Sequence, residues 1–216
     1  LNDDVEGETG GGVVPVLYKR KNLFNAMQWI TGMELFLLID DPWRVFLTTD
    51  HPNAGPFFRY PHVIKLLMDR DARTEAFERI SSRARKDALL AELGREYSLY
   101  EIAIITRAGT AQALGLKNKG HLGTGADADV TIYADLGDKE EMFAHPRYVL
   151  KDGEIVVRDG QLVQECTGRT LHVEPPYDPK IEANLRDHFE ECYTISFDNY
   201  PVASEYLPRG EVIPCS

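Results

Sequence analysis

The residues best placed to do chemistry are Asp50 and His51, which directly follow the apolar, β-rich segment 45–49. Pro52 interrupts further strand pairing because proline has no backbone N–H. A carboxylate on the last residue of a buried strand is held rigidly and is open on one side, which suits a metal ligand or a general base. An Asx turn, in which Asp50 accepts hydrogen bonds from loop amides, would explain the same residues without chemistry. The pair alone leaves both interpretations open.

Other polar residues give weaker patterns. Asn53 and the aromatic loop after it could hold a substrate or simply order the loop. His121 lies in a glycine-rich turn, which favours a surface residue over a ligand. Asp127 and Asp129 resemble part of a calcium loop, but a strand follows them and the closing glutamate is missing, so we expect turn formers. The sequence contains no Walker A motif, no G-x-S-x-G and no cysteine pair spaced for a metal.

The elements before Asp50 predict a step from a helix to a strand. Asn22 is a good N-cap for a helix over residues 23–39, which is apolar around most of its circumference. We therefore expect this helix to be buried on more than one side. Asp40, Asp41 and Pro42 end it, and residues 45–49 then form the strand. A buried helix, a tight acidic turn and an apolar strand are typical of a parallel sheet or barrel.

The residues after the site predict further helices and then a β region. Helical periodicity covers residues 62–68 and 73–91, and Ser98 with Glu101 predicts a capping box at the start of the next helix. Residues 130–133 form a strand, and the Asp-Gly pairs at 152–153 and 159–160 predict two hairpin turns. A last helix is expected over residues 180–192.

Composition limits the classes of function. The net charge of −11 argues against nucleic acid or an anionic membrane as the main partner, and no apolar run is long enough to span a membrane. Three widely spaced cysteines favour a reducing, cytoplasmic setting. The chain begins with Leu1 rather than Met, which is compatible with a fragment or with a subunit numbered from an arbitrary start.

Two segments resemble cyclic amidohydrolases such as dihydroorotases and hydantoinases. Residues 49–52, Thr-Asp-His-Pro, resemble the Asp-His-x-Pro motif on the last barrel strand of that family. Residues 106–116 and 119–130 resemble its exit from the barrel, A-x-x-L-G-L followed by K-G-x-L-x-x-G-x-D-A-D, into a small β domain. The resemblance implies an α/β fold that holds the last strand or strands and helices of a (β/α)8, or TIM, barrel, followed by strands of a small β-sandwich domain.

A finer resemblance, carried by segments 13–15, 41–43, 46–57 and 95–102, is to the amidohydrolase-like subunits of formylmethanofuran dehydrogenase. It implies that residues 1–116 are the carboxyl-terminal part of a metal-dependent hydrolase barrel. Residues 117–173 would form a β-rich composite domain, and residues 174–216 a packing tail. The implied reaction is the metal-assisted interconversion of formate plus methanofuran with N-formylmethanofuran, as in methanogenesis from carbon dioxide.

The same resemblance implies the cofactors and partners. A dinuclear metal site, with zinc as the expected metal, would take its H-x-H pair, carboxylated lysine and further histidines from earlier strands, none of which can be placed in this chain. Asp50 carries over as metal ligand and proton relay, and His51 and Asn53 as substrate-binding residues. The other subunits of the complex would be partners, one of them carrying a tungsten- or molybdenum-pterin.

Two alternatives remain open. The chain could belong to the corresponding A-like subunit of a formyltransferase/hydrolase complex, or to a non-catalytic scaffold that keeps the amidohydrolase fold. We expect the 216 residues alone to be inactive, because a partial barrel leaves open strand edges and an incomplete ligand set.

Overall fold

The computed structural model describes residues 17–51, 55–173, 176–194, 196–199 and 210–213. The chain divides into two compact units, Pro15–Cys166 and a second unit of Thr167–Ser216 with Leu1–Val14. No helix among the described residues is long and apolar enough to cross a membrane.

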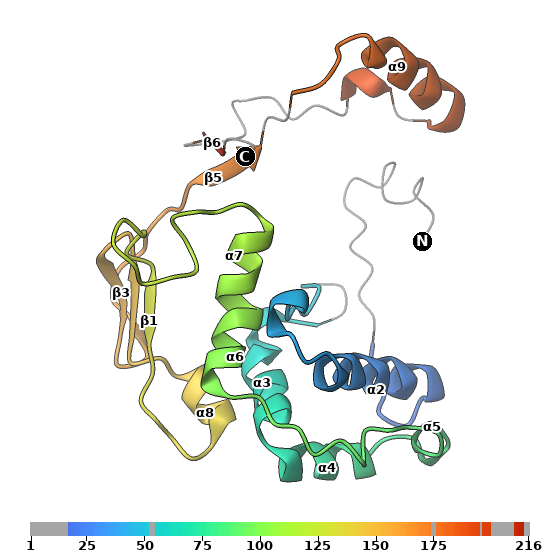
Figure 1. Ribbon diagram of the computed structural model, residues 1–216, viewed down its shortest axis with the longest axis vertical. Coiled ribbons are helices and arrows are strands. Elements are labelled where there is room, and N and C mark those ends of the chain that lie inside the picture. The colour runs from blue at the N-terminus through green and yellow to red at the C-terminus, as the bar shows by residue number, and fades with distance from the viewer. Residues whose placement is uncertain (1–16, 52–54, 174–175, 195, 200–209, 214–216) are drawn as a thin grey trace. The chain divides into compact units, whose positions relative to one another are not determined.

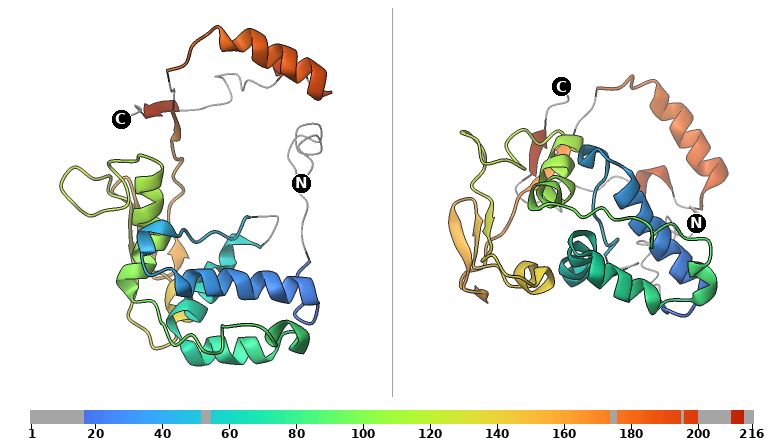
Figure 2. Two further views of the ribbon diagram at one scale, coloured as in Figure 1. Left: turned by 45° about the vertical axis from the view of Figure 1, so that its right-hand side comes forward. Right: turned by 60° about the horizontal axis from the view of Figure 1, so that its bottom comes forward.

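The larger unit begins with α2 (Leu23–Leu38), as the sequence predicts. The side chain of Asn22 accepts a hydrogen bond from the Asn25 N–H at 3.1 Å, which satisfies one of the free amides of the first turn. One face of α2 is buried, and α2 lies alongside α5 (Ser82–Arg85) (Figure 2). Exposed apolar side chains occupy a second face, so the prediction that the helix is buried on more than one side is wrong in this structure. The residues of this second face are Phe24, Met27, Leu35 and Leu38.

The helices that follow agree with the sequence only in part. α3 (Tyr60–Met68) confirms the helix expected there, but the helix expected over 73–91 is wrong. The chain instead forms α4 (Arg70–Glu78), turns at residues 79–81 and forms the single turn α5. The carboxylate of Glu34 accepts hydrogen bonds from the N–H groups of Leu89 and Leu90 at 2.7 and 2.9 Å. These tertiary bonds take the place of helical ones, so the periodic pattern is overridden.

α6 (Leu99–Ala103), η3 (Ile104–Ala108) and α7 (Gly109–Ala113) run on as one continuous helix (Figure 1). The capping box at its start is confirmed, because Ser98 and Glu101 each bond the other's backbone N–H. η3 is a π-helical turn, which the sequence does not predict. The helix ends before Gly115, whose φ of +70° suits glycine.

A four-stranded antiparallel sheet completes the larger unit, in the order β1 (Val130–Ile132), β2 (Tyr148–Lys151), β3 (Glu154–Arg158), β4 (Gln161–Leu162). Both hairpin turns are confirmed. Asp152 and Gly153 have φ of +50° and +86°, and Asp159 and Gly160 have +48° and +75°, as type I′ turns require. Between β1 and β2, α8 (Lys139–Ala144) packs against α3, where His62 meets Glu140 at 3.0 Å.

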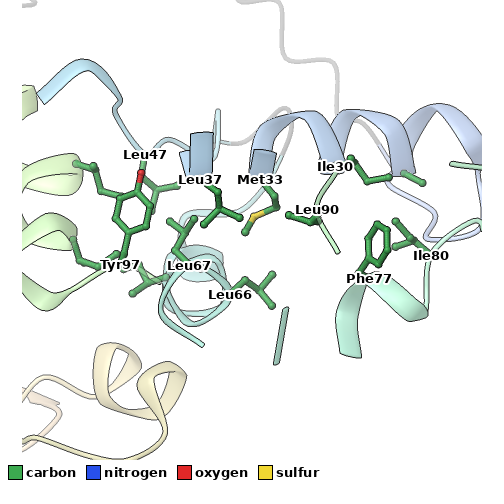
Figure 3. Close-up of a cluster of buried hydrophobic side chains, with 14 of the residues drawn as sticks. Ile30, Met33, Leu37, Leu47, Leu66, Leu67, Phe77, Ile80, Leu90 and Tyr97 are labelled. Atoms are coloured by element: carbon green, nitrogen blue, oxygen red, sulfur yellow. The ribbon is translucent and has the colours of Figure 1, made fainter. Parts of the chain in front are cut away.

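The core of this unit lies between α2, α3, α4 and α6. Figure 3 shows side chains of α2 facing Leu66 and Leu67 of α3, with Phe77 and Ile80 at one end and Tyr97 at the other. Arg73 is buried beside these side chains, with 2% of its surface exposed.

The second unit contains a parallel pair of strands, β5 (Thr170–Val173) and β6 (Gly210–Ile213). It also contains α9 (Ile181–Cys192), which confirms the last predicted helix, and the short η4 (Phe197–Asn199). The Phe189 and Phe197 rings lie 5.3 Å apart, and Arg186 pairs with Asp198 at 2.8 Å, so α9 packs against η4.

Candidate functional site

The segment that leads to Asp50 is held at its start by Arg95. The Nη1 atom of Arg95 donates to the carbonyl of Ile39 at 2.5 Å, just beyond the end of α2. Its Nη2 atom donates to Glu101 Oε1 at 2.8 Å. Burial alone would raise the pKa of Glu101, but hydrogen bonds from Ser98 and Arg95 outweigh burial and lower that pKa. The Arg95–Glu101 pair therefore fixes the end of α2 beside the start of α6.

After η1 (Pro42–Arg44), residues 45–49 are extended but form no strand with any described residue, so the predicted strand is wrong in this structure. An extended segment becomes a strand only when a neighbour completes the ladder of hydrogen bonds. The only backbone bond recorded for these described residues runs from the Leu47 N–H to the carbonyl of Ile105, at 2.9 Å. The segment is thus anchored on a helix rather than on a sheet.

The π-helical turn η3 makes that anchor available. In an α-helix the Gly109 N–H would donate to the carbonyl of Ile105, four residues earlier. In η3 it donates to Ile104 instead, which leaves the Ile105 carbonyl to accept from Leu47. Gly109 also has no side chain to obstruct the segment, since a Cβ there would lie 3.1 Å from Phe46 Cε1. Leu47 is buried in the core below.

Asp50 stands exposed at the end of this segment, with a left-handed φ of +48°. Its N–H donates to Thr48 Oγ1 at 3.1 Å, and among the described residues no group is recorded as donating to its carboxylate. An Asx turn would need the N–H of the residue two positions on, which is Pro52 and has none. The Asp50 carboxylate is therefore exposed to solvent, and an Asx turn does not explain it. Thr49 Oγ1 beside it is buried without a hydrogen-bond partner among the described residues.

His51 is exposed next to Asp50. Its Nδ1 accepts a hydrogen bond from the N–H of Phe57 at 3.3 Å, and the two rings meet edge to face with centroids 5.2 Å apart. Phe57 begins η2 (Phe57–Arg59), which runs directly into α3. Asn53, the third predicted site residue, lies outside the described residues. The roles of Asp50, His51 and Asn53 therefore stay predictions.

A cluster of acidic residues at the sheet is a charge clasp rather than a metal centre. Carboxylate oxygens of Asp127, Asp129 and Asp152 lie within 4.8 Å of one another. However, Lys119 Nζ lies 2.7 Å from both Asp127 and Asp129, and Lys151 Nζ lies 2.9 Å from Asp129 and 3.0 Å from Asp152. Two ammonium groups therefore already pair with all three carboxylates.

The clasp joins the loop after α7 to the turn between β2 and β3. Burial would raise the pKa of Asp129, but hydrogen bonds from Lys119, the Asp152 N–H and Lys151 hold that pKa well below its ordinary value. Asp127 and Asp129 thus do more than form the expected turn, because they bind the lysine of the K-G-x-L segment. His121 stays within its own loop, between the Lys117 carbonyl and the Gly123 N–H.

Two features that shape the site were missed from the sequence. The π-helical turn has no sequence signature beyond a glycine inside a helical pattern, at Gly109. Arg73 lies in a highly charged stretch that looks solvent-facing, and only the fold shows that its guanidinium donates inward to three backbone carbonyls.

The exposed Asp50 carboxylate and the small antiparallel sheet later in the chain are compatible with the amidohydrolase resemblance of the sequence. The family model of the amidohydrolase family matches residues 3–157, and the chain belongs to that family.

Two curated proteins and one solved structure are similar to this chain over almost its whole length. The chain is 45% identical over 224 aligned positions, 98% of its length, to "Protein FwdA" of Methanocaldococcus jannaschii. It is 40% identical over 93% of its length to the A-type subunit of the formyltransferase/hydrolase complex Fhc of Methylorubrum extorquens. It also matches a chain in the crystal structure of the FhcABCD complex with methylofuran, with a TM-score of 0.79 and 37% identity over 93% of this chain.

These matches confirm the resemblance to the carboxyl-terminal portion of FwdA-type subunits. The chain spans 39% and 37% of the lengths of the two curated relatives, and 37% of the matched chain in the solved complex.

Proposed function

We propose that this chain is part of the amidohydrolase-like subunit of a formylmethanofuran dehydrogenase, and that Asp50 is one ligand of its metal site. The reaction is the interconversion of N-formylmethanofuran plus water with formate plus methanofuran. The observation that carries the proposal is the Asp50 carboxylate, exposed without a recorded donor at the end of the anchored segment, in a chain 45% identical to FwdA.

The residues described here fit one part of a metal site. Asp50 supplies a single carboxylate, which zinc accepts as a ligand. The lysine-bridged cluster around Asp129 does not fit, and the sequence contains no H-x-H pair. We therefore propose that the remaining ligands of a dinuclear, zinc-type site come from outside these 216 residues. A bound metal would supply Lewis-acid polarisation of the formyl carbonyl and a water of lowered pKa.

Asp50 has two tasks in this proposal. Its carboxylate would hold the metal, and it would accept the proton that the attacking water loses. The same carboxylate then passes that proton to the amide nitrogen, and the C–N bond breaks to give the free amine and formic acid, which ionises to formate. In the direction of synthesis the carboxylate takes a proton from the amine that attacks formic acid and passes it to the hydroxyl group, whose C–O bond breaks to release water.

The larger unit offers surfaces that a complete barrel would cover. The backbone of residues 45–49 has no strand partner among the described residues, and the second face of α2 is apolar and exposed. We propose that the rest of the barrel covers both, and that these 216 residues alone are inactive. Other subunits, one with a tungsten- or molybdenum-pterin, would complete the enzyme.

The test is Asp50→Asn in the full-length subunit within its complex, with formate release from N-formylmethanofuran as the readout. We expect turnover to be abolished and folding to be kept. Asp41→Asn is the matched control, because Asp41 caps η1 in the same stretch of chain, where its side chain accepts from the Trp43 N–H at 3.1 Å. Near-normal turnover of the Asp50→Asn enzyme would contradict the proposal.

A second candidate is the A-like subunit of a formyltransferase/hydrolase complex, which the match to the Fhc relative supports. The two candidates share the site and differ in their partners. A pterin-containing redox subunit that co-purifies with the full-length chain supports the dehydrogenase, and a formyltransferase in its place supports the second candidate.

A further inference from the structure

We infer that His51 presents its Nε2–H as a hydrogen-bond donor to the carbonyl oxygen of the substrate, and that it is not a metal ligand. The inference deepens the proposed function and rests on it. Its starting point is the contact between the Phe57 N–H and His51 Nδ1, at 3.3 Å.

This contact decides which ring nitrogen carries the hydrogen. A backbone N–H can only donate, so Nδ1 must offer a lone pair to Phe57. In the neutral imidazole the single hydrogen then lies on Nε2. A metal needs a nitrogen lone pair, and in this tautomer the Nδ1 lone pair is already used. Nε2 can only donate, so metal ligation by His51 would require the contact with Phe57 to break.

The rest of the fold holds the ring in this state. Phe57 opens η2, and Pro56 before it provides no side-chain cap, so the Phe57 N–H would otherwise be a free amide at the start of a helix. η2 continues into α3, whose Ile64, Leu66 and Leu67 are buried in the core. The Phe57 ring also meets the imidazole edge to face at 5.2 Å. The acceptor contact and the ring contact therefore both come from Phe57.

The position of the donor indicates its ligand. His51 follows Asp50 directly, so their Cα atoms lie about 3.8 Å apart. Within the described part of the chain no group is recorded as accepting from Nε2, and the side chain is exposed. A donor on the residue next to the proposed metal-binding carboxylate suits a polar oxygen on the same substrate. In the proposed reaction that oxygen is the formyl carbonyl, whose negative charge grows during attack by water, so the hydrogen bond strengthens in the transition state.

Two substitutions at His51 separate the donor from the acceptor. His51→Gln places an amide N–H near the position of Nε2 and removes the acceptor for Phe57. His51→Asn keeps an acceptor near the position of Nδ1 and removes the Nε2 donor. Both are made in the full-length protein within its complex, and turnover of N-formylmethanofuran, metal content and melting temperature are measured for each.

We expect His51→Asn to lose about 10²- to 10³-fold in kcat, as expected when a donor to a developing oxyanion is removed. His51→Gln should lose at most about tenfold, and both variants should keep the metal content of the parent enzyme. Loss of metal in both variants would overturn the inference, because His51 would then be a ligand. If the His51→Asn enzyme kept its turnover and the His51→Gln enzyme lost it, the inference would also be overturned, because His51 would then serve only to cap η2. Equal turnover in the two variants, whether both keep it or both lose it, would overturn it as well, because activity would not follow the donor.

Failure of the proposed function is distinguishable from failure of this inference. An Asp50→Asn enzyme that still turns over refutes the proposed function. An inactive Asp50→Asn enzyme together with a fully active His51→Asn enzyme leaves the proposed function in place and refutes only the role given to His51.

Discussion

Arg73 carries a large stability prediction that can be worked from the structure. It is 2% exposed, and its guanidinium donates to the carbonyls of Leu66 at 2.8 Å, Arg95 at 2.9 Å and Leu93 at 3.2 Å. Burial lowers the pKa of Arg73, an effect that Glu96 opposes, but a guanidinium stays charged at neutral pH. These bonds tie the end of α3 to the chain that leads into Arg95, and so to the support of the site.

Arg73→Met keeps a long apolar stem and removes all three donors. Each hydrogen bond from a charged group contributes about 1.5–3 kcal/mol, and three carbonyls lose their partner together. Loss of the buried charge offsets part of this cost. We therefore expect the free energy of unfolding to fall by about 3–5 kcal/mol, the range typical when one member of a buried charged network is removed. The free energy of unfolding of Arg73→Lys should lie between those of Arg73→Met and the parent chain, because a single ammonium lacks the planar, forked donors of a guanidinium.

The assay is urea unfolding followed by tryptophan fluorescence. Both tryptophans, Trp29 and Trp43, lie in the larger unit, so the signal reports that unit alone. Arg83→Met is the matched control, since Arg83 is exposed on α5, and we expect its effect to stay within about 0.5 kcal/mol. An Arg73→Met chain that unfolds within about 1 kcal/mol of the parent, with the same denaturant slope, would refute the reasoning.

Two further predictions concern the exit from the helical part. Gly120→Ala should lower the free energy of unfolding in urea by about 1–3 kcal/mol more than Gly115→Ala. Both glycines have a positive φ, but a Cβ at Gly120 would lie 2.7 Å from Ala111 Cβ, whereas the space at Gly115 is open. Equal decreases for the two variants would show that the loop after α7 moves to accommodate the new methyl group. Asp129 has a folded-state pKa below its ordinary 3.8, so the stabilisation by its carboxylate is present above about pH 4 and is lost as the pH falls below that value. Urea midpoints measured from pH 6 to pH 2 should therefore fall less steeply for Asp129→Asn than for the parent chain, and parallel curves would show that the clasp contributes nothing.

Local signals predicted much of the fold. Three local patterns predict a backbone geometry that does not depend on distant contacts. They are the N-cap Asn22, the capping box at Ser98 and the two Asp-Gly turns. The errors fall where distant contacts decide. The helix expected over 73–91 ends at Glu78, and at the break the N–H of Ser81 donates to the carbonyl of Arg20, far away in sequence.

The candidate site was predictable in its location and not in its support. An apolar β-rich run that ends in Asp-His-Pro locates Asp50, and the structure exposes that residue at the end of an extended segment. The support is a π-helical turn, in which the Gly109 N–H donates to the carbonyl of Ile104 and the carbonyl of Ile105 accepts from the Leu47 N–H. No pattern in the sequence predicts these hydrogen bonds. The strand itself did not form, because pairing depends on neighbours and not on propensity.

The most direct test of the account is the position of metal in the full-length protein. We predict that anomalous X-ray scattering from crystals of the complex places a metal ion about 2.0–2.2 Å from an Asp50 carboxylate oxygen, with no metal at the lysine-bridged cluster of Asp127, Asp129 and Asp152. A fully metal-loaded, active complex in which the Asp50 carboxylate touches no metal would contradict the central claim.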